Sequence, residues 1–320
     1  MRFYTITGGA GFIGSHLADA VLAAGCGVRV LDDFSTGRIE NLDPRCEVIR
    51  GDVCDPAVVR QAMTGASGCF HLAAIASVVR ANEDWIGTHQ VNLGGMINVL
   101  DAARSLDGIP VVYASSAAVY GRVTGVADEQ TEPTPMTAYG ADKRGCELHA
   151  RAGALVHGLP SLGFRFFNVY GPRQDPHSPY SGVISIFAKA IASGHPVQIH
   201  GDGEQTRDFI YVADIVAFLR SGMVFLESGQ VDKQGAAGLV LNACTGRETS
   251  INQLVSTLGH LIASNPNVSH GPARSGDILR SVGSPSRAAG LLGIVAKTEL
   301  GAGLAGTLQG LQAPLRMQFA

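Results

Sequence analysis

The 320-residue chain has few charged residues, one tryptophan and no apolar run long enough to cross a bilayer. Only 16% of its residues are Asp, Glu, Lys or Arg while 46% are hydrophobic, a composition that excludes an intrinsically disordered chain. The formal net charge of −3 lacks the positive excess typical of nucleic-acid binding. A membrane helix needs ~18 consecutive apolar residues. We therefore expect a soluble globular protein without a nucleic-acid or membrane partner.

The six cysteines form no C-x-x-C pair and have no neighbouring histidine at metal-ligand spacing. This pattern favours buried thiols in a reducing compartment over disulfides or a metal site. The N-terminus enters a strand-like segment directly, without the charged and apolar regions of a signal peptide. The sequence therefore predicts a cytoplasmic protein that holds no metal.

Glycine, by contrast, is abundant: there are 41 in the chain, where ~7% of residues is usual. No G-X-Y repeat accompanies them, so collagen is excluded. Their placement between other segments is therefore the informative feature.

Strand-like and helix-like segments alternate along the first half of the chain. We expect strands at 2–7, 27–31, 46–50, 68–73, 110–114 and 161–167. We expect helices at 15–24, 91–103 and 138–157. This alternation predicts an α/β protein with a doubly wound parallel sheet of Rossmann type, covered by helices on both faces.

The second half of the chain is less regular. Helices are expected at 183–193, 211–225 and 251–263 and in a final Gly/Ala/Leu-rich stretch, with a strand at 196–200. Loops are expected at 171–182, 230–238 and 267–283. The last stretch, 300–311, holds four glycines and is a poor helix on intrinsic propensity.

A glycine-rich turn joins the first predicted strand to the first predicted helix. It contains G-x-G-x-x-G at Gly9, Gly11 and Gly14 and, from Gly8, also G-x-x-G-x-x-G. Such a turn lets the backbone approach a pyrophosphate, which then binds at the free N–H groups of the helix N-terminus. In this strand-to-helix context the motif predicts a dinucleotide site.

An acidic pair ends the second predicted strand. Asp32 lies 18 residues after Gly14, where dinucleotide folds place the acid that accepts hydrogen bonds from the adenosine ribose. A carboxylate there repels a 2′-phosphate, so Asp32 and Asp33 favour NAD over NADP. Asp52 and Val53 follow the third strand and are candidates for the adenine edge.

Tyr139 and Lys143 are spaced i, i+4 and so lie on one helix face. A tyrosine, whose ordinary pKa is ~10, is a poor base at neutral pH unless a neighbouring cation stabilises the phenolate. Ser115 and Ser116 follow the fifth predicted strand at its carboxyl end, where ligands bind in such sheets. A hydroxyl there can bind the reacting oxygen, which makes Ser116, Tyr139 and Lys143 the candidate catalytic residues.

Taken together, these segments resemble the extended short-chain dehydrogenases/reductases that act on nucleotide sugars, of the UDP-glucose or UDP-N-acetylglucosamine 4-epimerase type. The resemblance covers 2–292 and rests on TGGAGFIGSH, LDD, HLAA, YASSAAVYG, YGADK, RFFNVYGPR and GDGEQTRDFIYVADI. It implies an NAD-dependent enzyme that holds NAD tightly, takes a UDP-sugar and forms a homodimer through helices 91–103 and 138–157. It also implies an NAD-binding domain over 1–170, to which later segments return, and a smaller α/β substrate domain over 171–320.

The resemblance implies a role for individual residues as well. Tyr139 would be the acid/base, Lys143 would position the cofactor ribose, and Ser116 would assist at the sugar 4-OH. The implied cofactor-binding set is Gly8, Gly11, Phe12, Ile13, Gly14, Asp32, Asp33, Asp52, Val53, Leu72, Ala73, Ala74, Asn92, Ser115, Tyr139 and Lys143. The implied substrate-binding set is Ser77, Ser116, Asn168, Val183, Gln198, His200, Arg207, Arg274, Asp277 and Ser281.

Relatives in this family share an oxidation at C4 and differ in the chemical step that comes after it. In dehydratases and decarboxylases an acidic residue directly follows the strand-end Ser/Thr, whereas Ala117 and Ala118 stand here. Because alanine transfers no proton, the sequence favours a UDP-hexose 4-epimerase. Ser281 occupies the position where a small residue admits an N-acetyl group. A UDP-glucuronic acid 4-epimerase, a dehydrogenase or reductase, and a non-catalytic NAD(H)-sensing protein remain alternatives.

Overall fold

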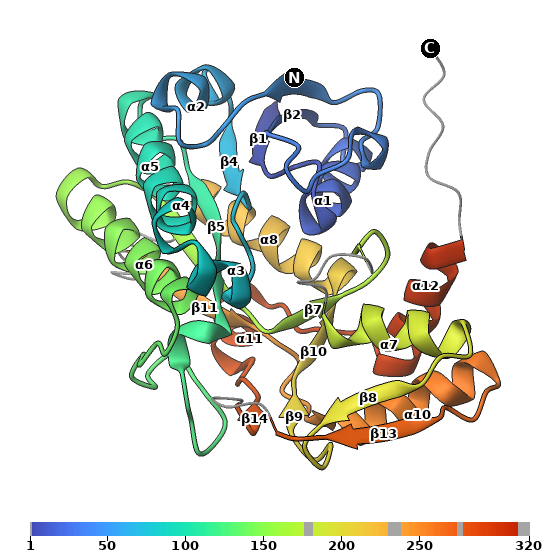
Figure 1. Cartoon of the computed structure of the whole chain (residues 1–320). Coiled ribbons are helices and arrows are strands. Elements are labelled where there is room, and N and C mark those ends of the chain that lie inside the picture. Colours follow the sequence, from blue (N-terminus) through green and yellow to red (C-terminus); the bar gives the residue numbers. More distant parts are fainter. Residues whose placement is uncertain (1, 176–181, 230–237, 274–277, 313–320) are drawn as a thin grey trace.

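The computed structural model describes residues 2–175, 182–229, 238–273 and 278–312. A sheet of seven parallel strands runs through the molecule in the order β11-β6-β5-β4-β1-β2-β3 (Figure 1). The strands are β1 (Phe3–Thr7), β2 (Gly27–Asp32), β3 (Glu47–Arg50), β4 (Gly68–His71), β5 (Val111–Ser116), β6 (Ser161–Phe166) and β11 (Leu239–Ala243). The predicted Rossmann-type sheet is confirmed.

Helices cover both faces of the sheet, as a parallel sheet requires. One face packs against α1 (Phe12–Ala23), α8 (Val212–Glu227) and α11 (Ser286–Leu292) in one apolar core. The other packs against α2 (Pro56–Met63), α5 (Gly95–Ser105) and α6 (Ala138–His157) in a second core. The inner strands β4 and β6 are buried along their whole length, and this includes the polar side chains of His71, Ser161 and Arg165.

The strand order fixes the position of the site. From β1 the chain builds outward through β2 and β3, and it then crosses back to place β4 on the other side of β1. The connections that leave the carboxyl ends of β1 and β4 therefore diverge. A doubly wound sheet opens a ligand-binding crevice at such a point.

A second lobe with its own apolar core lies below the carboxyl ends of the strands (Figure 1). Its helices are α7 (Val183–Ala192), α10 (Ile251–Ile262) and α12 (Leu300–Gln312). Its strand pairs are β7 (Asn168–Tyr170) with β10 (Phe209–Tyr211), and β8 (Val197–His200) with β13 (Val268–Gly271). A three-stranded sheet joins β12 (Thr249–Ser250), β9 (Thr206–Arg207) and β14 (Arg280–Ser281).

Most of the predicted elements are present, but the expected loop at 267–283 is wrong in its described part. It contains β13 and β14, whose partners β8 and β9 are distant in sequence. The expected helix at 91–103 is also longer, because α4 (Trp85–His89) and a π-helical turn (Gln90–Gly94) lead into α5. The loop expected at 230–238 lies outside the described residues except for its last residue, and so does the part of the other loop at 176–181.

Helix α12 forms in spite of its glycines, and packing explains why. A Cβ on Gly303 would collide with the phenol oxygen of Tyr170. A Cβ on Gly306 would lie 2.8 Å from the phenol oxygen of Tyr211, and one on Gly310 would lie 2.7 Å from Pro172. The three glycines therefore let α12 approach its neighbours more closely than any other residue would permit.

Candidate active site

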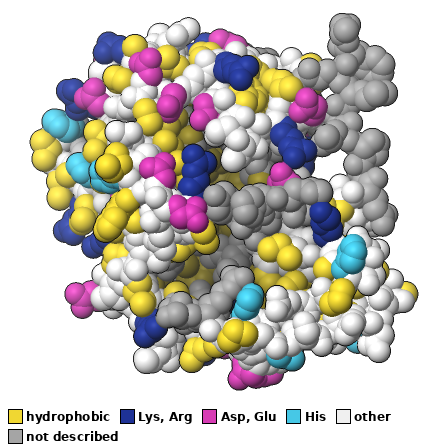
Figure 2. Space-filling view, in the orientation of Figure 1, with side chains coloured by type: hydrophobic (Ala, Val, Ile, Leu, Met, Phe, Trp, Pro, Cys, Tyr) yellow, Lys and Arg dark blue, Asp and Glu magenta, His cyan; other side chains and the backbone are white. Residues whose placement is uncertain are grey.

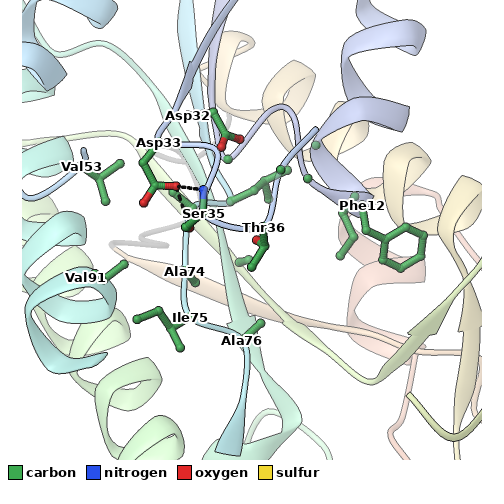
Figure 3. A pocket seen from close by; sticks show the side chains of 18 of the residues that line it. Phe12, Asp32, Asp33, Ser35, Thr36, Val53, Ala74, Ile75, Ala76 and Val91 are labelled. Atoms are coloured by element: carbon green, nitrogen blue, oxygen red, sulfur yellow. Dashed lines mark hydrogen bonds between the residues drawn. The ribbon is translucent and has the colours of Figure 1, made fainter. Parts of the chain in front are cut away.

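A cavity of about 710 Å³ opens at the carboxyl ends of β1, β2, β4 and β5. It brings together residues from the glycine turn, the acidic pair, the segment after β4, the end of β5 and the start of α6. Every predicted cofactor-binding residue except Asn92 lines it. Figure 3 shows Asp32 and Asp33 on one side of this cavity and Ile75 and Ala76 on another.

The glycine turn is shaped by contacts that only glycine allows. A Cβ on Gly14 would collide with the carbonyl oxygen of Gly8, and a Cβ on Gly8 would lie 2.7 Å from the nitrogen of Ala73. The turn is thereby pressed against both α1 and the segment after β4. Helix α1 begins at Phe12 without a side-chain cap and without an acidic residue in its first turn. Its N-terminus can accordingly hold a pyrophosphate.

The carboxylates near the turn are also anchored. Asp32 accepts hydrogen bonds of 2.9 Å from the N–H groups of Ala10 and Phe34, one on each oxygen. Burial raises its pKa, against those hydrogen bonds. Asp33 accepts from the N–H and the hydroxyl of Ser35, at 2.9 and 2.7 Å (Figure 3). Asp32 keeps one lone pair free on each oxygen, whereas both hydrogen bonds to Asp33 fall on its Oδ1 and leave its Oδ2 free. Both side chains can therefore still accept from a ribose.

The predicted catalytic residues meet at the end of β5. Thr137 caps α6 by accepting a hydrogen bond from the N–H of Gly140, and this fixes the first turn, which carries Tyr139. One turn later the buried ammonium of Lys143 donates to the carbonyl oxygen of Ala114 at 2.9 Å and lies 5.8 Å from the centre of the Tyr139 ring. Ser116 accepts a hydrogen bond from the N–H of Ala118, which leaves its own proton free to donate.

A second cavity, of about 360 Å³, lies beside the first. Four side chains line both cavities: Ser116, Tyr139, Phe166 and Phe167. Among the predicted substrate-binding residues, Asn168, Arg207 and Ser281 also line the second cavity. The phenol of Tyr139 and the hydroxyl of Ser116 therefore stand at the junction between a cofactor-sized cavity and a smaller one.

Two residues of the predicted cofactor-binding set have side chains that bind other protein groups. Asn92 is 1% exposed. Its side-chain oxygen accepts a hydrogen bond from the N–H of Ile75, and its side-chain NH2 group donates one to the carbonyl oxygen of Ile75. It therefore holds the segment after β4 and does not reach the cavity. The hydroxyl of Ser115 donates to Glu147 at 2.6 Å, so only the remainder of Ser115 faces the cavity.

Four predicted substrate-binding residues line neither cavity, and two more lie outside the described residues. Ser77 caps α3 (Val78–Glu83), and Val183 begins α7. Gln198 and His200 lie on β8, away from the cavity walls. Arg274 and Asp277 lie outside the described residues. These six roles stay predictions.

His71, at the end of β4, is buried and uncharged. Burial and the positive charge of Lys143 lower the pKa of its imidazole to about 3. Its Nδ1 lies 2.8 Å from the hydroxyl oxygen of Thr7, which also accepts from the N–H of Ala73. His71 thus supports the cavity wall as a neutral group and is unsuited to proton transfer at neutral pH.

Sequence reasoning missed several residues of the cavity wall. One group follows the acidic pair and consists of Ser35, Thr36 and Gly37. The other group lies in the helical segment before α5 and consists of Asp84, Gly87, Gln90 and Val91. Their spacing carries no motif, because loop closure and the π-helical turn bring them to the cavity. Within the described ranges no group of three or more metal-ligating side chains is found, and no helix could cross a membrane.

Comparison with known proteins agrees with this geometry. Residues 4–231 match the family described as NAD dependent epimerase/dehydratase. A UDP-glucose 4-epimerase of Mycolicibacterium smegmatis is 35% identical over 95% of this chain and 96% of its own.

Two solved structures are similar over nearly the whole chain. One is a UDP-glucose 4-epimerase of Thermotoga maritima with UDP-glucose (31% identity, TM-score 0.89, 97% of this chain and 99% of that one). The other is a UDP-N-acetylglucosamine 4-epimerase of Methanobrevibacter ruminantium with UDP-N-acetylmuramic acid (31% identity, TM-score 0.89, 97% and 98%). The chain belongs to the NAD-dependent epimerase/dehydratase family.

Proposed function

We propose that this protein is an NAD-dependent UDP-hexose 4-epimerase that interconverts UDP-glucose and UDP-galactose and also the N-acetylated pair. The observation that carries the proposal is the placement of Tyr139 and Ser116 in the wall shared by the two cavities. A sugar in the smaller cavity would there have a hydroxyl within reach of both. The similarity to the epimerases of M. smegmatis and T. maritima supports the same activity.

The large cavity fits NAD. The uncapped N-terminus of α1 and the turn at Gly8, Gly11 and Gly14 would hold the pyrophosphate. Asp32 and Asp33 would accept the ribose hydroxyls and repel the extra phosphate of NADP. When bound, NAD supplies an acceptor for the hydride that leaves C4 of the sugar, and that hydride later returns to C4.

The protein groups provide the proton transfer. Tyr139 removes the proton of the sugar 4-OH during oxidation and returns it during reduction. The Lys143 ammonium, held by its hydrogen bond to the carbonyl oxygen of Ala114, places a positive charge 5.8 Å from the centre of the phenol ring. The hydroxyl of Ser116 donates a hydrogen bond to the oxygen at C4 and so orients that oxygen.

The residues after Ser116 favour epimerisation over elimination. Ala117 and Ala118 line the second cavity next to Ser116, and neither can transfer a proton to a leaving group at C6. The 4-keto sugar would therefore turn and accept hydrogen on its other face. Return of the hydrogen to the face it left would simply regenerate the substrate.

The second cavity would hold the sugar and part of the UDP. Asn168 and Arg207 would contact the phosphates, with Arg207 positioned by its hydrogen bond of 2.7 Å to the carbonyl oxygen of Ile278. Ser281, on β14, leaves room for an N-acetyl group at C2 of the sugar. We propose that 1–170, together with α8, β11 and α11, binds NAD, and that the second lobe contributes the nucleotide-sugar site.

We also propose a homodimer in the cytoplasm. Helices α5 and α6 lie side by side and carry apolar residues on their outer surface (Figures 1 and 2). Ile97 is 38% exposed, Leu148 50%, Leu155 64% and Val156 72%. A second copy would bury this surface in a bundle of four helices. All six cysteines are free thiols, which suits a reducing compartment.

Incubation with single substrates tests the proposal. The purified protein is given UDP-glucose, UDP-N-acetylglucosamine or UDP-glucuronic acid, and each product is identified by NMR while NADH absorbance is followed. The 4-epimers of the first two are expected, without net NADH formation. Net NADH formation would instead support a dehydrogenase. Turnover of UDP-glucuronic acid alone would support a uronate epimerase, and NAD binding without any turnover would support an NAD(H)-sensing protein.

A further inference from the structure

We propose that Glu147 is a positioning residue that holds Ser116 in register with Tyr139 through the hydroxyl of Ser115. This inference rests on the proposed epimerase function. Glu147 touches neither cavity formed by the catalytic side chains, and it acts on them only through its neighbours.

Tyr139, Lys143 and Glu147 follow each other at intervals of four residues, so they lie on one face of α6 in successive turns. Lys143 donates to the carbonyl oxygen of Ala114, and Glu147 accepts from the hydroxyl of Ser115 at 2.6 Å. Two consecutive residues of β5 are thereby tied to the helix that carries Tyr139. The next residue of β5 is Ser116.

The carboxylate of Glu147 is itself immobilised. Arg165 donates to both of its oxygens, each at 2.8 Å, and Arg144 donates to Oε2 at 2.9 Å. The side chains of Glu147 and Arg165 are 1% and 3% exposed. Burial raises the pKa of Glu147, but the hydrogen bonds and charge of Arg165, with those of Ser115 and Arg144, outweigh it and lower the pKa. Glu147 is therefore a fixed, charged acceptor.

Arg165 extends this network to the other side of Ser116. It pairs with Ser115 in the β5–β6 ladder, and its guanidinium lies 4.6 Å above the ring of Tyr120. Tyr120 closes the short helical turn Ala117–Tyr120, which starts directly after Ser116. The residues before and after Ser116 are thus both attached to the Glu147–Arg165 pair.

An epimerase needs such a frame more than a one-way dehydrogenase does. The sugar must turn between two hydrogen transfers, and Ser116 and Tyr139 must be in the same place for both. A displacement of ~1 Å at a reacting group can cost about 100-fold in rate. Fixing β5 to α6 from two adjacent residues prevents that displacement without any contact with the substrate.

Ser115→Ala is the sharpest test, because Glu147→Gln removes the negative charge that pairs with the buried Arg165 and endangers folding. The alanine variant cuts only the link between Glu147 and β5 and keeps the ion pair. We expect kcat for UDP-glucose to fall about tenfold, while KM and the affinity for NAD stay unchanged. The Tm is expected to fall by a few degrees as well, because the substitution removes a buried hydrogen bond to a charged group.

The control is Ser161→Ala, the same change on the neighbouring strand β6. Ser161 is 1% exposed, and its hydroxyl has no partner in the described structure. Equal kcat values for Ser115→Ala and Ser161→Ala would overturn the inference. The proposed function would still stand in that case, provided that the wild type turns over. An inactive wild type would instead overturn the proposed function and this inference with it. In the Ser115→Ala background a folded Glu147→Gln should lower kcat by a smaller factor than in the wild-type background, and a fully additive loss would also overturn the inference.

Discussion

The ammonium of Lys143 lies 5.8 Å from the centre of the Tyr139 ring and is held there by its hydrogen bond to Ala114. A buried positive charge is thus fixed beside a phenol at the junction of two cavities. An ordinary surface tyrosine has neither feature. On this relationship rests our proposal that the phenol carries the proton in the epimerase reaction.

Tyr139→Phe removes the proton carrier and keeps the ring. We expect kcat for UDP-glucose to fall by about 10²–10⁴-fold, the usual contribution of a positioned acid/base, with NAD binding retained. Coupled assay of UDP-galactose formation and titration with NAD measure the two quantities. The matched control is Tyr113→Phe on β5, whose buried hydroxyl has no partner in the described structure. Turnover of Tyr139→Phe at the level of this control would remove Tyr139 from the mechanism.

Gly14→Ala should weaken NAD binding. The added Cβ collides with the carbonyl oxygen of Gly8, which pushes the turn away from the N-terminus of α1. We expect the affinity for NAD to fall about tenfold or more, since an error of 1.4 kcal/mol in fit already costs that factor. Calorimetric titration with NAD gives the value.

Gly290→Ala serves as the control for that substitution. Gly290 lies inside α11 with open space around its Cβ position, so alanine there should leave NAD affinity unchanged. It should add up to about 1 kcal/mol of stability through helix propensity. Equal NAD affinities for the two variants would show that the glycine turn does not hold the cofactor.

Acidification should destabilise the protein through His71. Its folded-state pKa is about 3, against 6.5 for the free imidazole, so the unfolded chain binds the proton first as the pH falls. The stabilising contribution is present above pH 6.5 and is lost progressively toward pH 3. Between pH 7 and pH 5 this amounts to about 2 kcal/mol.

Urea unfolding of the wild type and of His71→Asn across that pH range isolates this contribution. Asparagine keeps an acceptor for the hydroxyl of Thr7 and does not titrate. The variant should therefore lose less stability on acidification than the wild type. Parallel pH dependences of the two proteins would mean that His71 contributes nothing to acid denaturation.

The sheet, the glycine turn and the Tyr–Lys pair could be predicted because each depends on a local pattern. Strand and helix periodicities, a turn between them and a spacing of four residues are all local properties of the sequence. The start of α2 was equally visible: Asp55 accepts from the N–H groups of Ala57 and Val58 ahead of the helix, and Pro56 is its first residue. Helix α2 is not among the predicted elements, although its start carries this local signal.

Other features depend on contacts between distant segments and have no local pattern. Strands β13 and β14 exist only because β8 and β9 lie beside them. The glycines of α12 weaken the helix on propensity, yet they fit against Tyr170, Tyr211 and Pro172. Ser115 is predicted to bind the cofactor, and nothing in its neighbourhood in the sequence indicates that its hydroxyl binds Glu147, 32 residues later.

Leu155→Glu should shift the proposed dimer toward monomer. Leu155 is 64% exposed on the outer surface of α6, and a buried unpaired carboxylate there opposes association. Sedimentation velocity measures the change. Val224→Glu, at a position 65% exposed on α8 across the sheet, should leave the assembly unchanged. A wild type that sediments as a monomer, or equal behaviour of the two variants, would contradict the proposed interface.

Ser281→Tyr should separate the two sugar classes. Ser281 lines the second cavity from β14, and a tyrosine there would fill the space proposed for an N-acetyl group. We expect kcat/KM for UDP-N-acetylglucosamine to fall by about 10- to 100-fold, the range that steric discrimination of small groups reaches. The value for UDP-glucose should change little, because a hydroxyl at C2 needs no such space. Ser281→Ala is the control and should turn over both sugars as the wild type does. An equal loss for both sugars in the tyrosine variant would mean that Ser281 faces another part of the substrate.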